Sequence, residues 1–441
     1  MENIGGFDFF RLTIDENGKL TSGDVLEGLK QRAASATAVI FLSHGWRNDV
    51  NDATTLYTNF LTNYHSHFAR PECAALTKAN FAVAGIYWPS LIVPEHIGTP
   101  EGSTQSVDPD AAMIAALTQK LSDLKDLVPG YAPQIDQAIQ LLPRLKQDGD
   151  AQNQFTDLLL SPVKDQSPDP TEGFDSLLNQ DGTVILRKLS PSDDSGTSAG
   201  NGGGVDSVGS VQGIGSSLVS ILQGADTFIN FTTWWIMKNR SGVVGATGVA
   251  QAVRELAASK PDLQIHLVGH SLGGRVMASC CKSLAQDPIY HPASVTLLEA
   301  AFSHYGFSGH NSQGKPGFFR DVIEKKVVKG PLLATFSEQD TVVGTIYALA
   351  SRVVRDNVSA IGDSKDPYGG LGHNGAVETD EKTVSKLQTA GNPYQFQIGV
   401  VSCLDGSGGL IKDHGDVTNP DVTYAFACSV ASTQTTAASA T

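Results

Sequence analysis

A serine enclosed by glycines is the part of this sequence best suited to nucleophilic chemistry. Residues 269–273 read Gly-His-Ser-Leu-Gly and follow a short apolar run at residues 265–268. That run predicts a strand buried on both faces, and residues 275–285 switch to helix-forming side chains. Ser271 would then lie at the tip of a sharp turn, where flanking glycines let strand and helix approach closely. This context, more than the pentapeptide itself, predicts that Ser271 is a nucleophile.

The segment resembles the nucleophile elbow of the α/β-hydrolase superfamily, and specifically that of its serine esterases and lipases. The resemblance covers residues 39–90 and 264–427 of the 441-residue chain. It implies an α/β-hydrolase fold, built on a mainly parallel, doubly wound sheet. It also implies a catalytic triad whose members follow the chain order serine, acid, histidine.

The acid that this order implies is Asp340. An apolar run at residues 332–336 predicts a strand, and Asp340 lies in the loop that follows it directly. Glu338 in the same loop is the nearby alternative, and Glu299, after the preceding predicted strand, is a more remote one. A carboxylate in the implied position would orient the histidine ring and stabilise its cation.

The histidine that the resemblance implies is His414, which follows a predicted final strand at residues 394–403. A neutral imidazole there can take the proton of Ser271 and return it to the leaving group. His373 also stands in a glycine-rich setting, but it precedes the final strand, which favours a role at the pocket edge or in the structure. His270, beside the nucleophile, is more typical of a packing residue than of a base.

A second loop resembles the oxyanion loop of the same superfamily. The sequence Ser-His-Gly-Trp at residues 43–46 follows an apolar predicted strand at residues 38–42. In such a loop a backbone N–H points at the negative charge that develops on the substrate carbonyl. The implied donors are the N–H groups of Trp46 and Leu272, although His44 can instead fix the turn and Trp46 can be a pocket wall. Four residues are expected to line the substrate pocket: His44, Gly45, His270 and His373.

The elements that must position these residues alternate between strands and helices, as a doubly wound sheet requires. Residues 9–14 and 81–88 predict two further strands, and a turn at residues 16–18 predicts an opening antiparallel hairpin. Helical patterns occupy residues 24–34 and 53–68, with apolar side chains on one face.

The connection between Ser90 and residue 264 is far too long for one crossover, so we expect a helical, lid-like insertion there. Asp108 and Pro109 predict a helix start within it. Residues 192–216 are dominated by Gly, Ser and Asp and predict a mobile loop. The expected organisation is a hydrolase core of residues 1–90 and 225–428, a helical and irregular insertion of residues 91–224 and a flexible tail of residues 429–441.

Composition excludes several classes of function. The formal net charge of -15 opposes binding to nucleic acid or to an anionic membrane surface. No apolar run is long enough for stable membrane insertion, and the first residues do not read as a secretory leader, so we expect a soluble, cytoplasmic protein. The five cysteines have no framework spacing and predict reduced core residues, without a zinc site.

Together these features predict a serine hydrolase that cleaves a small-molecule carboxylic ester through an acyl-enzyme intermediate, without cofactor or metal. Amides, thioesters and lactones stay open as substrates, as do the acyl and alcohol specificity and the oligomeric state. The alternative from another class is a non-catalytic ligand-binding protein that retained the fold. An intact set of serine, aspartate and histidine argues against that alternative, because a binding protein needs none of the three.

Overall fold

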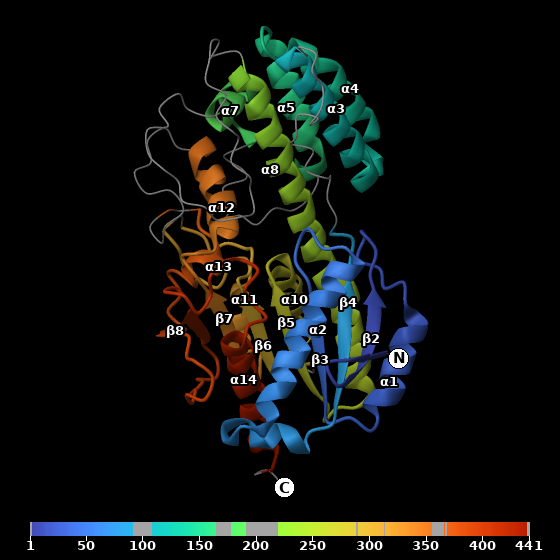
Figure 1. Ribbon diagram of the computed structural model, residues 1–441, viewed down its shortest axis with the longest axis vertical. Helices are drawn as coiled ribbons and strands as arrows, with labels where there is room; N and C mark the ends of the chain where they lie inside the picture. The colour runs from blue at the N-terminus through green and yellow to red at the C-terminus, as the bar shows by residue number, and fades with distance from the viewer. Residues whose placement is uncertain are drawn as a thin grey trace. The chain divides into compact units, whose positions relative to one another are not determined.

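A nine-stranded sheet runs through the described part of this computed structural model, which covers residues 2–90, 108–164, 178–190, 219–287, 290–312, 314–354, 366 and 368–438. Its strand order is β1-β2-β4-β3-β5-β6-β7-β9-β8 (Figure 1). β1 runs antiparallel to β2, and the other neighbouring pairs are parallel. The predicted α/β class with a mainly parallel sheet is therefore confirmed. The strands are β1 (Glu2–Ile4), β2 (Phe7–Thr13), β3 (Ala38–Ser43), β4 (Phe81–Tyr87), β5 (Gln264–His270), β6 (Ser294–Leu298), β7 (Leu332–Phe336), β8 (Lys382–Lys386) and β9 (Val401–Asp405).

The central strands form where the sequence is apolar without interruption. β3, β4, β6 and β7 are buried along their whole length, as parallel strands covered on both faces must be. These strands closely match the ranges that the apolar runs predict. The hairpin at the amino terminus differs from the expected one, because β1 and β2 join through Gly5 and Gly6, while residues 16–18 close only a single bridge between Ile14 and Leu20.

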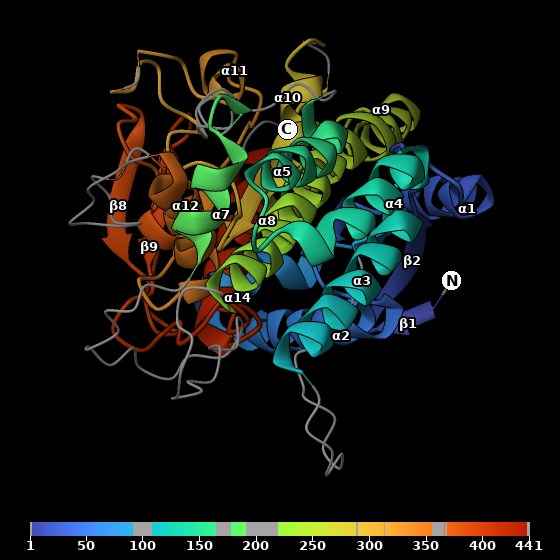
Figure 2. The same cartoon turned by 90° about the horizontal axis from the view of Figure 1, so that it is seen from above.

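Helices cover both faces of the sheet (Figures 1 and 2). On one face α1 packs against α9 and against the strands, and α10 contacts β3, β5 and β6. On the other face α2 packs against α14, and α14 reaches β6. Each helix turns an apolar stripe inward, as an amphipathic helix on a sheet must. Their bounds are α1 (Gly23–Ala33), α2 (Val50–Ser66), α9 (Ala250–Ser259), α10 (Leu272–Leu284) and α14 (Pro420–Ala438).

The last part of the sheet departs from the sequence-based expectation. The final strand β9 begins at Val401, so Tyr394 and the residues after it are not part of it. The ring of Tyr394 instead packs near Tyr424 of α14, and Gly399 has a positive φ of 82° that interrupts an extended run. The edge strand β8 escaped prediction because its side chains are polar and largely exposed. α14 also extends past residue 428 into the expected tail, because Val430 and Ala431 are buried.

The chain divides into two compact units. The sheet unit comprises Met1–Leu91, Arg240–Tyr347 and Gly362–Thr441, and the helical unit comprises Ile92–Asn239 and Ala348–Ile361. Residues 225–239, expected in the core, fall in the helical unit. They belong to the long helix α8 (Val219–Val244), whose Asp226 and Phe228 contact side chains of the other inserted helices. The predicted mobile loop at residues 192–216 lies outside the described residues.

The helical unit is a set of packed helices in the inserted part of the chain. α4 contacts both α3 and α5, and α5 contacts α7. Lys120 of α3 pairs with Asp226 of α8 at 2.6 Å, and the Phe155 and Phe228 rings lie 6.4 Å apart. Asp108 caps α3 as predicted by accepting from the Asp110 N–H. The other bounds are α3 (Pro109–Leu127), α4 (Ala132–Leu141), α5 (Gly149–Lys164) and α7 (Gly182–Leu189).

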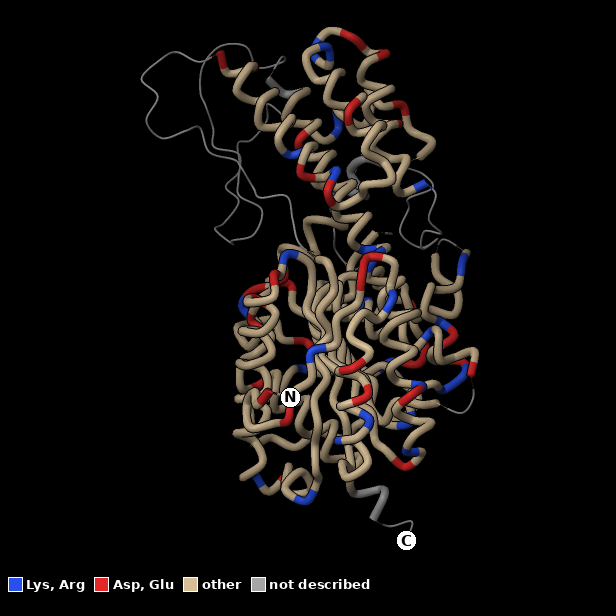
Figure 3. The backbone as a smooth tube through the Cα atoms, turned by 90° about the vertical axis from the view of Figure 1, so that its right-hand side faces the viewer, with Lys and Arg blue, Asp and Glu red and all other residues tan. Residues whose placement is uncertain are grey.

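Basic and acidic residues are interspersed along the backbone of both units (Figure 3). Within the described residues, no helix combines the length and the apolar character that a bilayer crossing requires. All five cysteines lie in the described ranges, and they are buried and free of disulfides, as predicted.

Candidate active site

The parallel sheet brings five chain segments to one edge. The carboxyl ends of β3, β5, β6, β7 and β9 meet there, since these strands run in the same direction. In the order β4-β3-β5, the next strand in the chain after β3 lies on one side of it, and the strand after that, β5, lies on the other side. In open α/β sheets, ligands bind beside the carboxyl ends of strands at such a change of direction. All residues discussed below lie in the sheet unit.

Ser271 forms the sharp turn between β5 and α10. Its φ of 57° and ψ of -125° lie in a backbone region that residues other than glycine rarely adopt. The turn is held by the Ser271 N–H, which donates to the Leu298 carbonyl at 2.9 Å, and by the Ala301 N–H, which donates to the Ser271 carbonyl at 3.1 Å. A Cβ on Gly273 would lie 2.2 Å from the Ser43 carbonyl oxygen, so glycine is required for this approach. The expected strained turn is therefore present.

The structure brings Asp340 and His414 together. The Nδ1 of His414 lies 2.8 Å from Asp340 Oδ2, in a pair that joins residues 74 positions apart. The Val343 N–H donates to the other oxygen, Asp340 Oδ1, at 2.9 Å. Asp340 is fully buried, and His414 is 15% exposed. The alternative acid Glu338 is exposed and its N–H pairs with Ser407, so its side chain is not part of this arrangement.

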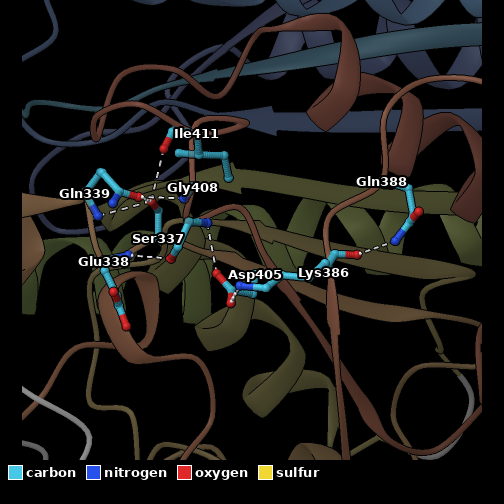
Figure 4. Close-up of polar contacts among 9 residues, drawn as sticks. Ser337, Glu338, Gln339, Lys386, Gln388, Asp405, Gly408 and Ile411 are labelled. Carbon is cyan, nitrogen blue, oxygen red and sulfur yellow. Dashed lines mark hydrogen bonds and ion pairs between the residues drawn. The ribbon is translucent and has the colours of Figure 1, made fainter.

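A hydrogen-bond network joins the loop of Asp340 to the loop of His414 (Figure 4). The Ser337 hydroxyl lies 3.0 Å from the Ile411 carbonyl oxygen and 2.9 Å from Gln339 Oε1. The Glu338 N–H donates to Ser407 at 2.9 Å, and Ser407 is itself held by Asp405 at the end of β9. These contacts fix the two loops against each other and so support the spacing of the Asp340 and His414 side chains.

His270 links the turn of Ser271 to the loop of His414. Its Nε2 lies 2.7 Å from the His414 carbonyl oxygen, and the two rings are 4.7 Å apart. Burial, followed by the neighbouring His414, lowers the pKa of His270 to about 3, so the ring is neutral and its single proton is on Nε2. Within the described residues, the Ser271 hydroxyl makes no hydrogen bond to the His414 ring. Such contacts are often loose in unliganded enzymes.

The loop after β3 lies directly against Ser271. A Cβ on Gly45 would be 2.6 Å from the Cβ of Ser271 and 3.1 Å from its hydroxyl oxygen. His44 fixes this loop: it stacks on Trp88 with the rings 5.5 Å apart, and its backbone N–H donates to the Tyr57 hydroxyl at 2.9 Å. Its Nδ1 donates to the Gly45 carbonyl at 2.9 Å, and burial lowers the pKa of His44 to about 4. These contacts are those of a turn-fixing residue.

The two expected oxyanion donors have free backbone N–H groups. In the part of the chain that the structure describes, the N–H of Trp46 and that of Leu272 donate to no other protein group. Leu272 is the first residue of α10, where the helix dipole favours a negative charge. His373, the fourth expected pocket residue, lies beside Asp340: its Nδ1 donates to the Asp340 backbone carbonyl at 3.0 Å, a contact that agrees with a structural role.

Glu299, the more remote of the alternative acids, follows β6 directly. The residue is fully buried and has a positive φ of 45°. Three possible ligand atoms lie within 4.8 Å of one another, one each from Glu299, Asp340 and His414. Among the described residues, these three side chains form the group that could hold a metal ion. The only signal in the sequence was the position of a carboxylate at the end of an apolar strand, next to the strand that precedes Asp340.

Comparison with known proteins adds no relative to this picture. A scan against protein-family models finds no match, and searches of curated proteins and of solved structures find none either. A functional assignment therefore depends on the residues at the carboxyl edge of the sheet. They are a serine in a strained turn, an aspartate–histidine pair and two free backbone N–H groups.

Proposed function

We propose that this protein is a serine hydrolase with an α/β-hydrolase fold, and that it cleaves carboxylic esters. One observation carries the proposal: a serine in a strained strand-to-helix turn shares a sheet edge with an aspartate–histidine pair 2.8 Å apart. The three residues follow the chain order serine, aspartate, histidine, which is that of the α/β-hydrolases. A packing role would not require a buried aspartate, a paired histidine and a strained serine on three neighbouring loops.

The proposed reaction begins with proton transfer. Because His414 Nδ1 donates to Asp340, the lone pair of the neutral ring is on Nε2, which can accept the Ser271 proton. The Ser271 oxygen then attacks the substrate carbonyl carbon, and the negative charge collects on the carbonyl oxygen. The Trp46 and Leu272 N–H groups stabilise that oxygen, with a typical effect of about 10²–10³-fold on rate for each such donor.

Collapse of this intermediate releases the alcohol, which takes the proton from His414 Nε2, and leaves the acyl group on Ser271. Water then attacks the acyl-enzyme and gives its proton to His414, which returns that proton to the Ser271 oxygen as the bond to the acyl group breaks and the acid is released. Asp340 stabilises the imidazolium that forms in both halves. Esters are the favoured substrates over amides, because an alkoxide leaves more readily than an amine that must first be protonated.

The test is a panel of chromogenic esters of increasing acyl length, run beside matched amides and thioesters, together with fluorophosphonate labelling. We expect ester hydrolysis with a preference for short to medium acyl groups, slower amide hydrolysis and a label on Ser271. Ser271→Ala should lose several orders of magnitude in kcat and all labelling, with unchanged thermal unfolding. Ser432→Ala, which changes an exposed serine of α14, is the matched control and should behave like wild type.

Two outcomes would count against the proposal. Retention of more than about a tenth of wild-type activity by Ser271→Ala would exclude this serine as the nucleophile. Inactivity on the whole panel, without labelling, would favour the ligand-binding protein. In the same assays, His414→Ala should lose at least about 10²-fold in rate. His373→Ala should have a smaller effect, because the His373 ring donates to the backbone carbonyl of Asp340 and not to its carboxylate.

A further inference from the structure

The carboxyl group of Glu299 is buried in an unusual setting. The residue is fully enclosed at the carboxyl end of β6, and neither of its side-chain oxygens has a hydrogen-bond partner among the described residues. Buried polar groups are nearly always paired, and an ionised carboxylate without a partner is strongly disfavoured in a protein interior. The side chain is therefore either neutral or occupied by something that binds it.

The backbone holds Glu299 in this position from two sides. Its φ of 45° is strained for a residue with a Cβ, and its N–H lies 3.2 Å from the Thr335 hydroxyl of β7. A Cβ on Gly372, in the short helix α13 (Leu371–Asn374), would lie 2.4 Å from the Glu299 carbonyl carbon. Strain and an unpaired buried carboxyl group at one residue indicate a role beyond packing.

The neighbours of Glu299 are the two proposed triad members. One of its oxygens, one Asp340 oxygen and one His414 ring nitrogen lie within 4.8 Å of one another. Asp340 already accepts hydrogen bonds from His414 and from the Val343 N–H, whereas Glu299 accepts none. The groups whose charges act on Glu299 are carboxylates, namely Asp340, Asp413 and Asp416. Burial, and then these carboxylates, raise the pKa of Glu299 well above its usual value.

We propose that Glu299 is a positioning residue whose neutral carboxyl group fills the space beside Asp340 and leaves a single negative charge facing the His414 ring. The proposal depends on the proposed function, because it assigns Glu299 to the same proton-transfer machinery. A second ionised carboxylate at this distance would stabilise the imidazolium and keep the His414 proton in place at neutral pH. A neutral acid keeps the polar surroundings of Asp340 without that effect.

A divalent cation is the other occupant that these three donors could hold. The geometry favours the proton, because His414 Nδ1 already pairs with Asp340 at 2.8 Å, and a metal on that nitrogen would displace the proton of the pair. Glu299 and Asp340 are also completely enclosed. The metal therefore enters the experiment as an outcome that would overturn the proposal.

The experiment follows the His414 ring by NMR as a function of pH in the full-length protein, and its signal is identified by its loss in His414→Gln. Glu299→Gln replaces a neutral acid by a neutral amide of the same shape, so the titration midpoint of His414 should stay within about 0.3 pH units. If Glu299 were ionised, its loss would lower the midpoint by about one unit or more, the size of effect expected from a nearby charge. Glu338→Gln is the matched control, because Glu338 is exposed.

Turnover gives a second readout. Glu299→Ala should lower kcat by about tenfold with little change in KM, and Glu299→Gln should restore the rate to within about twofold, because only the alanine variant empties the space beside Asp340. A lower midpoint in Glu299→Gln, or wild-type behaviour of Glu299→Ala in both assays, would overturn the proposal. So would loss of activity on chelation that Zn²⁺ restores in wild type only. The NMR comparison needs no turnover, so it stays decisive if the ester panel fails.

Discussion

Two buried carboxyl groups lie just after the carboxyl ends of neighbouring strands and differ in their hydrogen-bond partners. Asp340, after β7, accepts hydrogen bonds from His414 and from the Val343 N–H. Glu299, after β6, is equally enclosed but has no partner in the described part of the chain. Burial alone favours the neutral form of both, and hydrogen bonds from donors favour the charged form of one. The comparison teaches that enclosure and pairing are separate properties: two adjacent acids that are equally buried differ in the hydrogen-bond donors that the fold brings to them.

The difference arises from the loops. The loop of Asp340 turns into the start of a helix, where the Val343 N–H donates to its carboxylate, and the Ser337 network ties it to the His414 loop. The Glu299 backbone is instead pressed between β7 and Gly372, which fixes the side chain but offers it no donor. Three variants test this contrast.

The largest effect is expected from Asp340→Asn. The amide keeps the shape of the side chain but removes the charge that stabilises the His414 cation, and it can force the ring into the wrong tautomer. We expect kcat for ester hydrolysis to fall by about 10³–10⁴-fold. Glu338→Gln, in the same loop, should stay within about twofold of wild type. If Asp340→Asn keeps more than about a tenth of the activity, Asp340 is not the triad acid, and Glu299 becomes the candidate.

The stability of Glu299→Gln should reveal the neutral acid directly. Because the pKa of Glu299 is raised in the folded state, the folded protein holds this proton more tightly than the unfolded chain. Its contribution to stability is therefore present below the unfolded pKa of about 4.3 and is lost as pH rises toward the folded pKa. Between pH 5 and 8 the variant should gain at least about 1 kcal/mol relative to wild type, since each pKa unit corresponds to about 1.4 kcal/mol.

The measurement is urea unfolding of wild type and Glu299→Gln across this pH range, with the exposed Glu338→Gln as control. Parallel curves for wild type and Glu299→Gln would show that Glu299 titrates alike in the folded and unfolded states, against the neutral-acid interpretation. If the free energy of unfolding of Glu299→Gln, relative to wild type, instead increased toward low pH, the sign would be opposite to the expected one. That result would indicate that the Glu299 carboxylate is ionised and stabilised in the folded protein.

The smallest effect is expected from Ser337→Ala, which loosens the contact between the two loops of Figure 4. Loss of the hydroxyl leaves the Ile411 carbonyl without this partner, which should cost about 1 kcal/mol in the free energy of unfolding. Because the Asp340–His414 spacing depends on both loops, kcat should fall a few-fold. Gln388→Ala removes a contact to Lys386 in the same region and should leave kcat unchanged. Equal kcat values for Ser337→Ala and Gln388→Ala would show that the hydrogen-bond network does not position Asp340 and His414.

The sequence by itself determined the local features of this protein. The apolar runs specified β3, β4, β6 and β7, because fully buried parallel strands need apolar side chains on both faces. The glycines around Ser271 specified the strained turn, and Asp108 specified the start of α3, because these depend on backbone geometry within a few residues. The chain order that the family resemblance implies also singled out Asp340 and His414, which the structure brings into contact.

Only the tertiary structure decided the features that depend on distant partners. The contact of His270 with the His414 carbonyl joins residues 144 positions apart, and nothing local to either residue specifies it. The start of β9 depended on the packing of Tyr394 against α14, and the length of α14 on buried side chains beyond residue 428. The setting of Glu299 came from Gly372, far along the chain. Periodicity reports what one segment prefers, whereas burial and pairing depend on which segments the fold brings against it.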